Sequence, residues 1–349
     1  MNSIKRRLSE IRAALGSVRD RGDLSVLLVS GRLEFFDLEE FEAPLGDRIG
    51  RVAAVSHERE LRRLNERFDI ALVCSSLAEG NANLAIRQRE LAGLVCNWTF
   101  DNHHHEIANL RASQLADVII PGHAFARDYL LSPFHLMGPH MPLPTSQWSR
   151  ARTRRVVEET LGVPRLDALY GGFFLYKIGV ERNRLLTTLA QELPNHALVL
   201  RSSNDRSSWF SRTPDERLRE WTGYKVSLNV PVNQDLPIRV FDSLIAGQIP
   251  LVPERCLDLD RVVPTAIQES LPIIRFKDYT VEAVEAAWRA ALARFDADGA
   301  EGVLRRHSFA REHHHLGPRL AGIVDCLAGL ASQQVRLVTA PSGAFGLTV

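Results

Sequence analysis

The chain has 349 residues, of which 45% are hydrophobic and 24% are charged, as is usual for a globular protein. This length suits two domains of ordinary size. The formal net charge of +1 excludes the strong positive field by which many proteins attract nucleic acid, so we expect no nucleic-acid partner.

Four cysteines, Cys74, Cys96, Cys256 and Cys326, are widely separated, and none belongs to a CxxC pair. The first two end apolar runs of strand length, which is typical of reduced thiols in a core. No run approaches the roughly 20 apolar residues of a membrane span. Residues 1–16 are too basic throughout for a signal peptide. We therefore expect a reduced, cytoplasmic protein.

The chain begins with apolar residues at helical spacing, which are Ile4, Leu8, Ile11, Leu15 and Val18. Basic residues occupy the other faces, so the pattern predicts an amphipathic helix. We expect this helix to pack on its own domain with a solvated back. Contact of its basic side with the inner face of a membrane is the alternative.

Short apolar runs then alternate with helical stretches along the first half of the chain. The predicted strands are residues 24–30, 70–74, 94–97 and 118–120. Buried strands that alternate with helices predict a parallel sheet with helices on both faces. Residues 138–155 break this pattern, because they are rich in proline and arginine and lack apolar periodicity, so they predict a linker.

Beyond the linker the same alternation resumes, with predicted strands at residues 168–175, 197–201, 225–228, 249–252 and 273–275. We therefore predict an α/β protein with an N-terminal domain at 1–150, a C-terminal domain at 151–335 and a tail at 336–349. Two doubly wound sheets of this kind bind ligands at the carboxyl ends of their strands, in a cleft between the domains.

The stretch LNVPVNQDLPIRVFDSLIAGQIPLVPE, residues 228–254, places a polar loop between two core elements. The candidate ligand-binding residues in it are Asn233, Gln234, Asp235, Arg239 and Asp242. Backbone amides and a helix N-terminus here suit a diphosphate, to which Arg239 adds a charge-assisted bond. Asp242 could accept bonds from a ribose diol, and Gly247 lets the helix end. An ordinary strand–loop–helix connection is the alternative for each residue taken singly.

This stretch resembles the donor-binding segment of GT-B glycosyltransferases, and most of all the CgeB-like "glycosyl transferases group 1" domain. The family's run Arg-x-Phe-Glu-x-Leu-Ala-x-Gly is matched by Arg239, Phe241, Leu244, Ala246 and Gly247, and Asp242 replaces the glutamate. A second, weaker match is RRHSFAREH, with His307, Ser308, Phe309 and Arg311. Together the matches cover about the last half of the chain.

The resemblance implies two Rossmann-like domains that face each other across a cleft. It places a nucleotide-sugar donor in the C-terminal domain and an acceptor in the other, with no cofactor and no obligatory metal. Related retaining enzymes carry two acids eight positions apart, which here are Gln234 and Asp242. Because Gln234 is an amide, the resemblance leaves open whether transfer inverts or retains the sugar's configuration. Asp235, which is beside it, is the candidate to replace the missing acid.

YGGFFLYK, residues 170–177, is the next candidate. Glycines directly after a strand, here Gly171 and Gly172, let a ligand approach the backbone closely. Lys177, with Arg182 and Arg184 after it, could neutralise a leaving diphosphate. Arg201 at the end of a later strand is placed to contact a base or ribose. A solvated helix face is the alternative for any single cation.

In the first half, CNWTFDNHHHE at residues 96–106 is the densest polar cluster after a strand. Inverting transfer needs a general base near the acceptor hydroxyl, for which we choose Asp101, and then His103 or His104. Successive histidines do not face one point, so we expect no metal site there. We expect the second triplet, residues 313–315, to be exposed on a late helix.

We therefore predict a hexosyltransferase-type glycosyltransferase that moves a sugar from a nucleoside-diphosphate donor to a saccharide, lipid-linked or protein acceptor, as in cell-envelope polysaccharide biosynthesis. One alternative is a nucleotide-sugar epimerase of the same fold. The other is a nucleotide- or sugar-binding protein that has lost catalysis, for which Gln234 is the sign. A dehydrogenase is disfavoured because no glycine segment has dinucleotide-binding spacing.

Overall fold

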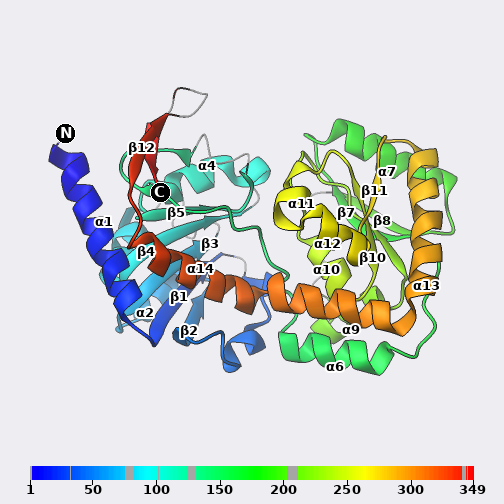
Figure 1. Cartoon of the computed structure of the whole chain (residues 1–349), viewed down its shortest axis with the longest axis horizontal. Coiled ribbons are helices and arrows are strands. Elements are labelled where there is room, and N and C mark those ends of the chain that lie inside the picture. The colour runs from blue at the N-terminus through cyan, green and yellow to red at the C-terminus, as the bar shows by residue number, and fades with distance from the viewer. Residues whose placement is uncertain are drawn as a thin grey trace. The chain divides into compact units, whose positions relative to one another are not determined.

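The computed structural model describes residues 2–31, 33–74, 82–100, 102–124, 130–202, 211–339, 343 and 345–349. The chain forms two compact units, unit 1 with Met1–Leu143 and Leu316–Val349, and unit 2 with Pro144–His315 (Figure 1). The division near residue 143 lies close to the expected one at 150. Residues 316–335 and 336–349, which the sequence analysis placed in the second domain and in a tail, belong to unit 1.

Unit 1 is built on a sheet that has eight strands in the described residues, in the order β12-β13-β6-β5-β4-β3-β1-β2. The strands are β1 (Leu24–Ser30), β2 (Ile49–Val55), β3 (Phe68–Cys74), β4 (Ala92–Thr99), β5 (Val118–Pro121), β6 (Leu136–Met137), β12 (Arg336–Thr339) and β13 (Phe345–Thr348). Its helices are α1 (Asn2–Asp20), η1 (Leu33–Phe35), η2 (Leu38–Glu42), α2 (Glu58–Arg63), α3 (Ala82–Leu91), α4 (Asn102–Ser113) and α14 (Leu316–Leu330). Only β12 runs antiparallel to its neighbour in this described sheet.

Helix α1 confirms the predicted amphipathic helix. Ile11, Leu15 and Val18 are buried on one face, and the helix packs against α14. The basic residues Lys5 and Arg6 on the other side are exposed. In the described residues, no helix has both the length and the apolar character that crossing a membrane requires.

Unit 2 has a five-stranded described sheet, all parallel, in the order β11-β10-β9-β7-β8. Its strands are β7 (Tyr170–Leu175), β8 (Ala197–Ser202), β9 (Val226–Leu228), β10 (Ile249–Pro253) and β11 (Ile274–Phe276). Its helices are α6 (Arg150–Thr160), α7 (Val180–Glu192), α9 (Pro214–Thr222), α10 (Arg239–Ile245), α11 (Leu257–Val262), α12 (Thr265–Ser270) and α13 (Val281–His313). The strand order reverses between β7 and β9, which is the topological switch point of the sheet.

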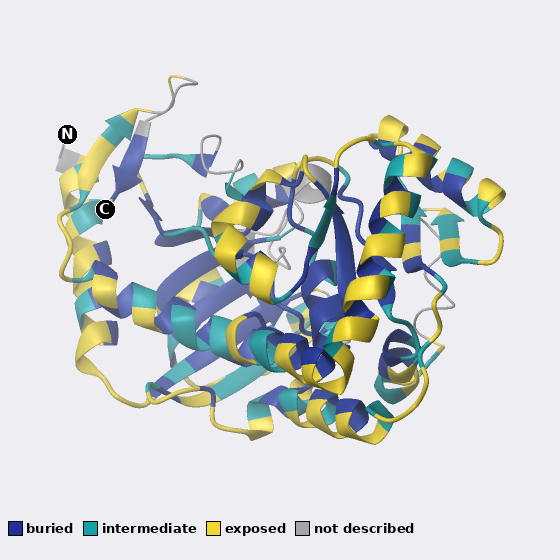
Figure 2. Cartoon of the chain, turned by 45° about the vertical axis from the view of Figure 1, so that its right-hand side comes forward, coloured by how far each residue is buried: buried dark blue, intermediate teal, exposed yellow. Residues whose placement is uncertain are grey.

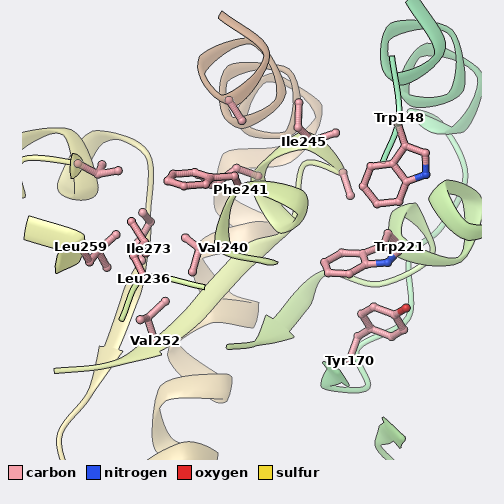
Figure 3. Close-up of a cluster of buried hydrophobic side chains, with 14 of the residues drawn as sticks. Trp148, Tyr170, Trp221, Leu236, Val240, Phe241, Ile245, Val252, Leu259 and Ile273 are labelled. Atoms are coloured by element: carbon pink, nitrogen blue, oxygen red, sulfur yellow. The ribbon is translucent and has the colours of Figure 1, made fainter. Parts of the chain in front are cut away.

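Helices cover both faces of the unit 2 sheet, so the strands β9 and β10 are buried while the outer sides of the helices are exposed (Figure 2). The edge strand β8 has no buried residue. Helices α7 and α13 pack on one face. On the other face α10 lies in an apolar cluster with Trp148, Trp221 and Tyr170 (Figure 3). The rings of Trp148 and Trp221 meet edge to face with centroids 6.0 Å apart. Every residue of α10 after its first is buried, which fixes the helix firmly in the unit.

Gly247 ends α10 as the sequence predicted. Its φ of 75° is in the left-handed region, where side chains other than glycine are strained. A Cβ at this position would also lie 2.5 Å from Cγ1 of Val303, which is too close. The glycine therefore allows α13 to pack directly on the turn that leads into β10.

Candidate functional site

The segments after β7 and β9 meet at the carboxyl edge of the unit 2 sheet. Open α/β sheets bind ligands at this edge, at the switch point between two such strands. The segment after β9 is the polar loop 229–238, and the segment after β7 leads into α7. The candidate site is therefore built from these two segments and from the first turns of α7 and α10.

Two guanidinium groups lie over the ring of one buried phenylalanine at this edge. The guanidinium carbon of Arg182, from α7, is 5.4 Å from the ring centroid of Phe173, and that of Arg239, from α10, is 5.0 Å away. Burial, and then the neighbouring charge of Arg239, lower the pKa of Arg182 to about 10. Burial also lowers the pKa of Arg239. Two cations held this closely favour an anion between or beside them.

The two arginines differ in how their donors are used. Arg182 is buried, and it donates from Nε to the carbonyl of Val230 at 2.9 Å and from Nη1 to the carbonyl of Phe174 at 2.9 Å. Arg239 is half-buried, and its Nη1 is buried without a hydrogen-bond partner in the part of the chain that the structure describes. Arg182 therefore joins the two segments, whereas Arg239 has a donor that no described residue uses.

Gly171 and Gly172 lie inside β7, as its second and third residues, and not after its end. A Cβ at Gly171 would lie 2.6 Å from Cε2 of Phe173, so the missing side chain makes room for the ring that carries both arginines. Gly172 is exposed. Their predicted direct contact with a ligand stays a prediction, but Gly171 has an indirect part in the site through Phe173.

The loop after β9 combines buried and exposed polar side chains. Asn229 is buried and donates from Nδ2 to Ser243 Oγ at 3.3 Å, which joins the strand end to α10. Asp235 is also buried and accepts the N–H of Asn233 at 3.1 Å. The side chains of Asn233 and Gln234 are exposed. Asp235, and not Gln234, is therefore the anionic group that the loop holds in place near Arg182.

Asp242 is buried one turn into α10, and both of its carboxylate oxygens are occupied. Oδ1 accepts the hydroxyl of Thr145 at 2.5 Å, and Oδ2 accepts Nε2 of Gln147 at 2.9 Å. Burial raises the pKa of Asp242 to about 6, although these two bonds favour the ionised form. Its predicted contact with a ribose would have to use the remaining lone pairs or act through a neighbour.

Helix α10 has only seven residues, so its dipole adds little to anion binding. The N–H groups of Val240 and Phe241 are bonded to the carbonyls of Pro237 and Ile238. The predicted cradle of backbone amides at residues 234–239 remains untested. The positive charge of the site comes from the side chains of Arg182 and Arg239.

Two further predicted cations lie near the ends of the neighbouring strands β7 and β8. Lys177 is exposed in the segment that follows β7. Arg201 is half-buried near the end of β8 and pairs in register with Phe174 of β7. Both lie toward the expected edge, but the structure shows no contact between either one and the arginine pair.

The candidate general bases belong to the part of the sequence that follows β4. Asp101 lies outside the described residues. His103 and His104 belong to α4, which follows β4, but their side chains also lie outside what is described. Within the described ranges, no group of three or more His, Cys, Asp or Glu side chains is arranged to hold a metal ion.

The RRHSFAREH element has a structural role. Arg306 is fully buried and donates from Nε to the carbonyl of Gly247 at 3.0 Å, and the ring of His307 is 2.7 Å from the carbonyl of Ile245. The expectation that residues 313–315 are exposed is wrong for two of them. Both His314 and His315 are buried. The ring of His314 stacks on the ring of Phe241 with centroids 4.2 Å apart, and Nε2 of His315 is 2.7 Å from the carbonyl oxygen of Trp148.

Sequence reasoning missed Thr145, Gln147 and Phe173. The first two lie in the proline-rich stretch that reads as a linker, and no periodicity there indicates contact with α10. Phe173 reads as an ordinary apolar strand residue. Only the two arginines that lie over it, which are far apart in sequence, give the ring its role.

Comparison with known proteins gives a likeness in structure only. No family model and no curated protein sequence matches the chain. An alpha,alpha-trehalose 6-phosphate synthase from Burkholderia multivorans superposes with a TM-score of 0.50 at 10% identity, over 80% of this chain and 75% of that one. A UDP-forming alpha,alpha-trehalose-phosphate synthase from Burkholderia xenovorans superposes with a TM-score of 0.47 at 12% identity, over 79% of this chain and 77% of that one.

An alpha1,3-fucosyltransferase gives a TM-score of 0.43 at 12% identity, over 85% of this chain and 93% of that one. The chain spans 60% of the length of a matching chain in a GtfA/B complex. At these identities a likeness establishes the architecture alone. Two Rossmann-like units with parallel sheets, together with the synthase superposition, show that this protein has the GT-B fold.

Proposed function

We propose that this protein transfers a sugar from a nucleoside-diphosphate-sugar donor to a saccharide, lipid-linked or protein acceptor, in the manner of a hexosyltransferase. The observation that carries the proposal is the arginine pair over Phe173 at the switch point of the unit 2 sheet. The trehalose-phosphate synthase name of the Burkholderia multivorans neighbour agrees with sugar transfer.

The arginine pair suits the chemistry of this reaction. When the sugar leaves its donor, negative charge develops on the departing diphosphate. Arg239 has a buried Nη1 that bonds to no described residue, and Arg182 is fixed beside it by two backbone carbonyls. Cations fixed in advance in a buried site stabilise such charge without reorganisation when the bond breaks.

The remaining parts of the reaction stay as proposals. Asp101, or else His103 or His104, would accept the proton of the acceptor hydroxyl if transfer inverts the sugar. The nucleotide sugar is a co-substrate, and we assign no metal. Biosynthesis of cell-envelope polysaccharide, at the inner face of the membrane, is the setting that we propose.

The test is a thermal-shift screen of the purified protein with UDP, GDP, ADP, CMP and dTDP. A nucleotide at a hundred times its dissociation constant stabilises the fold by about 2.7 kcal/mol. We expect one clear hit, and we expect Arg239→Ala to weaken it by about 10- to 100-fold, because a charge-assisted bond contributes about 1.5–3 kcal/mol.

Arg289→Ala is the matched control, because Arg289 is an exposed arginine on α13 that pairs only with Glu285 in the described residues. It should leave the affinity unchanged. If no nucleotide binds, or if Arg239→Ala binds as well as the wild type, the proposed donor site is wrong.

Incubation with a nucleotide sugar in the absence of acceptor separates the alternatives. An epimerase would convert the sugar, and a protein that has lost catalysis would bind without turnover.

A further inference from the structure

The segment that enters unit 2 is bound to α10 through Asp242. Thr145 and Gln147 donate to its two carboxylate oxygens at 2.5 and 2.9 Å. The backbone of Thr145 is fixed as well, because its N–H donates to the carbonyl of His314 at 2.9 Å. The amide of Gln147 is therefore held by a buried carboxylate, two residues along the chain from a backbone N–H that is itself bonded.

These contacts decide which way the amide of Gln147 faces. An ionised carboxylate only accepts hydrogen bonds, so it selects the NH2 group of the amide and turns the oxygen away. The oxygen, Oε1, is buried, and among the described residues it has no hydrogen-bond partner. Buried polar atoms in folded proteins are nearly always bonded, so an oriented acceptor without a donor indicates a missing partner.

The position of Gln147 indicates what that partner is. Arg239 and Asp242 are three residues apart on α10, and side chains at this spacing are neighbours on a helix surface, about 5–6 Å apart. A diphosphate at Arg239 therefore brings the next part of the same molecule, the ribose, to the place where Gln147 meets Asp242. Ribose hydroxyls are donors that an amide oxygen can accept.

We propose that Gln147 accepts a hydrogen bond from a ribose hydroxyl of the nucleotide through Oε1, and that Asp242 is a positioning residue that holds the amide in this orientation. This inference rests on the proposed function, because it needs a nucleoside diphosphate at the arginine pair. It differs from what the sequence resemblance implies, which is that Asp242 itself contacts the ribose.

The test measures the affinity of the nucleoside diphosphate that binds in the screen, and of its 2′-deoxy and 3′-deoxy analogues, by calorimetry. In the wild type we expect one deoxy analogue to bind about tenfold more weakly, the usual contribution of one hydrogen bond. In Gln147→Ala we expect the ribonucleotide to weaken by the same factor and the deoxy analogue to be unaffected, so that the discrimination is lost. Asp242→Asn should reduce the discrimination in the same way.

Arg239→Ala is the control, because a phosphate contact should weaken all the nucleotides by one common factor and leave the discrimination intact. Gln147→Leu, which fills the same space, serves if the alanine variant does not fold. Discrimination that persists in both Gln147 variants, or is absent in the wild type, overturns this inference while the donor site stands. Failure of every nucleoside diphosphate to bind the wild type overturns the proposed function together with the inference.

Discussion

The two ends of α10 carry similar groups with opposite consequences. At its start, Arg182 and Arg239 share the ring of Phe173. At its end, Arg165 and Arg306 share the ring of Phe295, at 5.5 and 5.1 Å. Each of the two arginine pairs includes a buried Nη atom without a partner in the described residues, so that feature does not separate them.

The two arginine pairs differ in the groups that neutralise their positive charge. Arg165 donates to the carbonyl of Ala246 at 2.8 Å, and Arg306 donates to that of Gly247 and to the carboxylate of Asp298 at 3.1 Å. These are the free carbonyls of a helix C-terminus, where cations are favourable. Arg239 at the other end makes no ion pair with a described residue. The comparison teaches that the far pair closes the helix, whereas the near pair is the one that we propose as the ligand site.

The largest expected effect comes from breaking the pair of Arg165 and Arg306 at the end of α10. Arg306→Ala removes a fully buried guanidinium from Gly247 and Asp298, and we expect it to lower the free energy of unfolding by about 3–5 kcal/mol. The control is Arg305→Ala, which removes an exposed partner of the same Asp298 and should cost about 1 kcal/mol or less. Urea denaturation measures both, and equal losses in the two variants would contradict the role given to Arg306.

The second prediction compares the titrating groups at the two ends. The pKa of Asp242 is raised to about 6 and that of His307 is lowered to about 4, both by burial. Asp242 therefore contributes stability that is complete below pH 3.8 and is lost as the pH rises through 6. His307 contributes stability that is complete above pH 6.5 and is lost as the pH falls through 4. Each contribution amounts to about 3 kcal/mol.

Urea denaturation between pH 4 and 7, followed by tryptophan fluorescence, measures these contributions. The difference in unfolding free energy between the wild type and Asp242→Asn should fall with rising pH. The difference between the wild type and His307→Asn should rise over the same range. Parallel curves for the wild type and a variant would show that the pKa of that group is not shifted.

The smallest expected effect comes from changing only the two phenylalanine rings on which the arginine pairs lie. Phe173→Leu and Phe295→Leu each remove a surface on which two guanidinium groups lie, with a cation–π contribution of about 0.5–2 kcal/mol. We expect Phe173→Leu to weaken nucleotide binding several-fold, because Arg239 loses its support. Phe295→Leu should lower the melting temperature and leave nucleotide affinity unchanged. Nucleotide affinity and melting temperature, measured on both variants, check this prediction. An equal loss of affinity in the two variants would remove the distinction between the arginine pairs.

Much of the fold follows from the sequence, because apolar runs of strand length alternate with helical patterns over both units. The left-handed turn at Gly247 and the place of Arg239 and Asp242 at the start of a helix also follow from local patterns. These features depend on residues that are near one another in the chain. Local patterns therefore predict two parallel α/β units, and the resemblance of residues 228–254 adds the GT-B architecture.

The rest depends on contacts that local patterns do not record. Thr145 and Gln147 reach Asp242 from a segment without periodicity, and His314 is buried because it stacks on the distant Phe241. Helix α14 follows α13 directly, so nothing in the sequence marks its change from unit 2 to unit 1. The ring of Phe173 fills the space beside Gly171, a contact that the local pattern does not indicate.

The return of the chain to unit 1 has a consequence for biosynthesis. Leu347 of β13 pairs with Leu136 of β6, and α14 covers the apolar side of α1, although all of unit 2 lies between these partners in sequence. Unit 2 is continuous and can fold as soon as it leaves the ribosome. Unit 1 must wait with an open sheet edge and an uncovered helix until unit 2 has been made. During synthesis the first unit to emerge is thus the last to be completed, and it is the one that needs protection from aggregation.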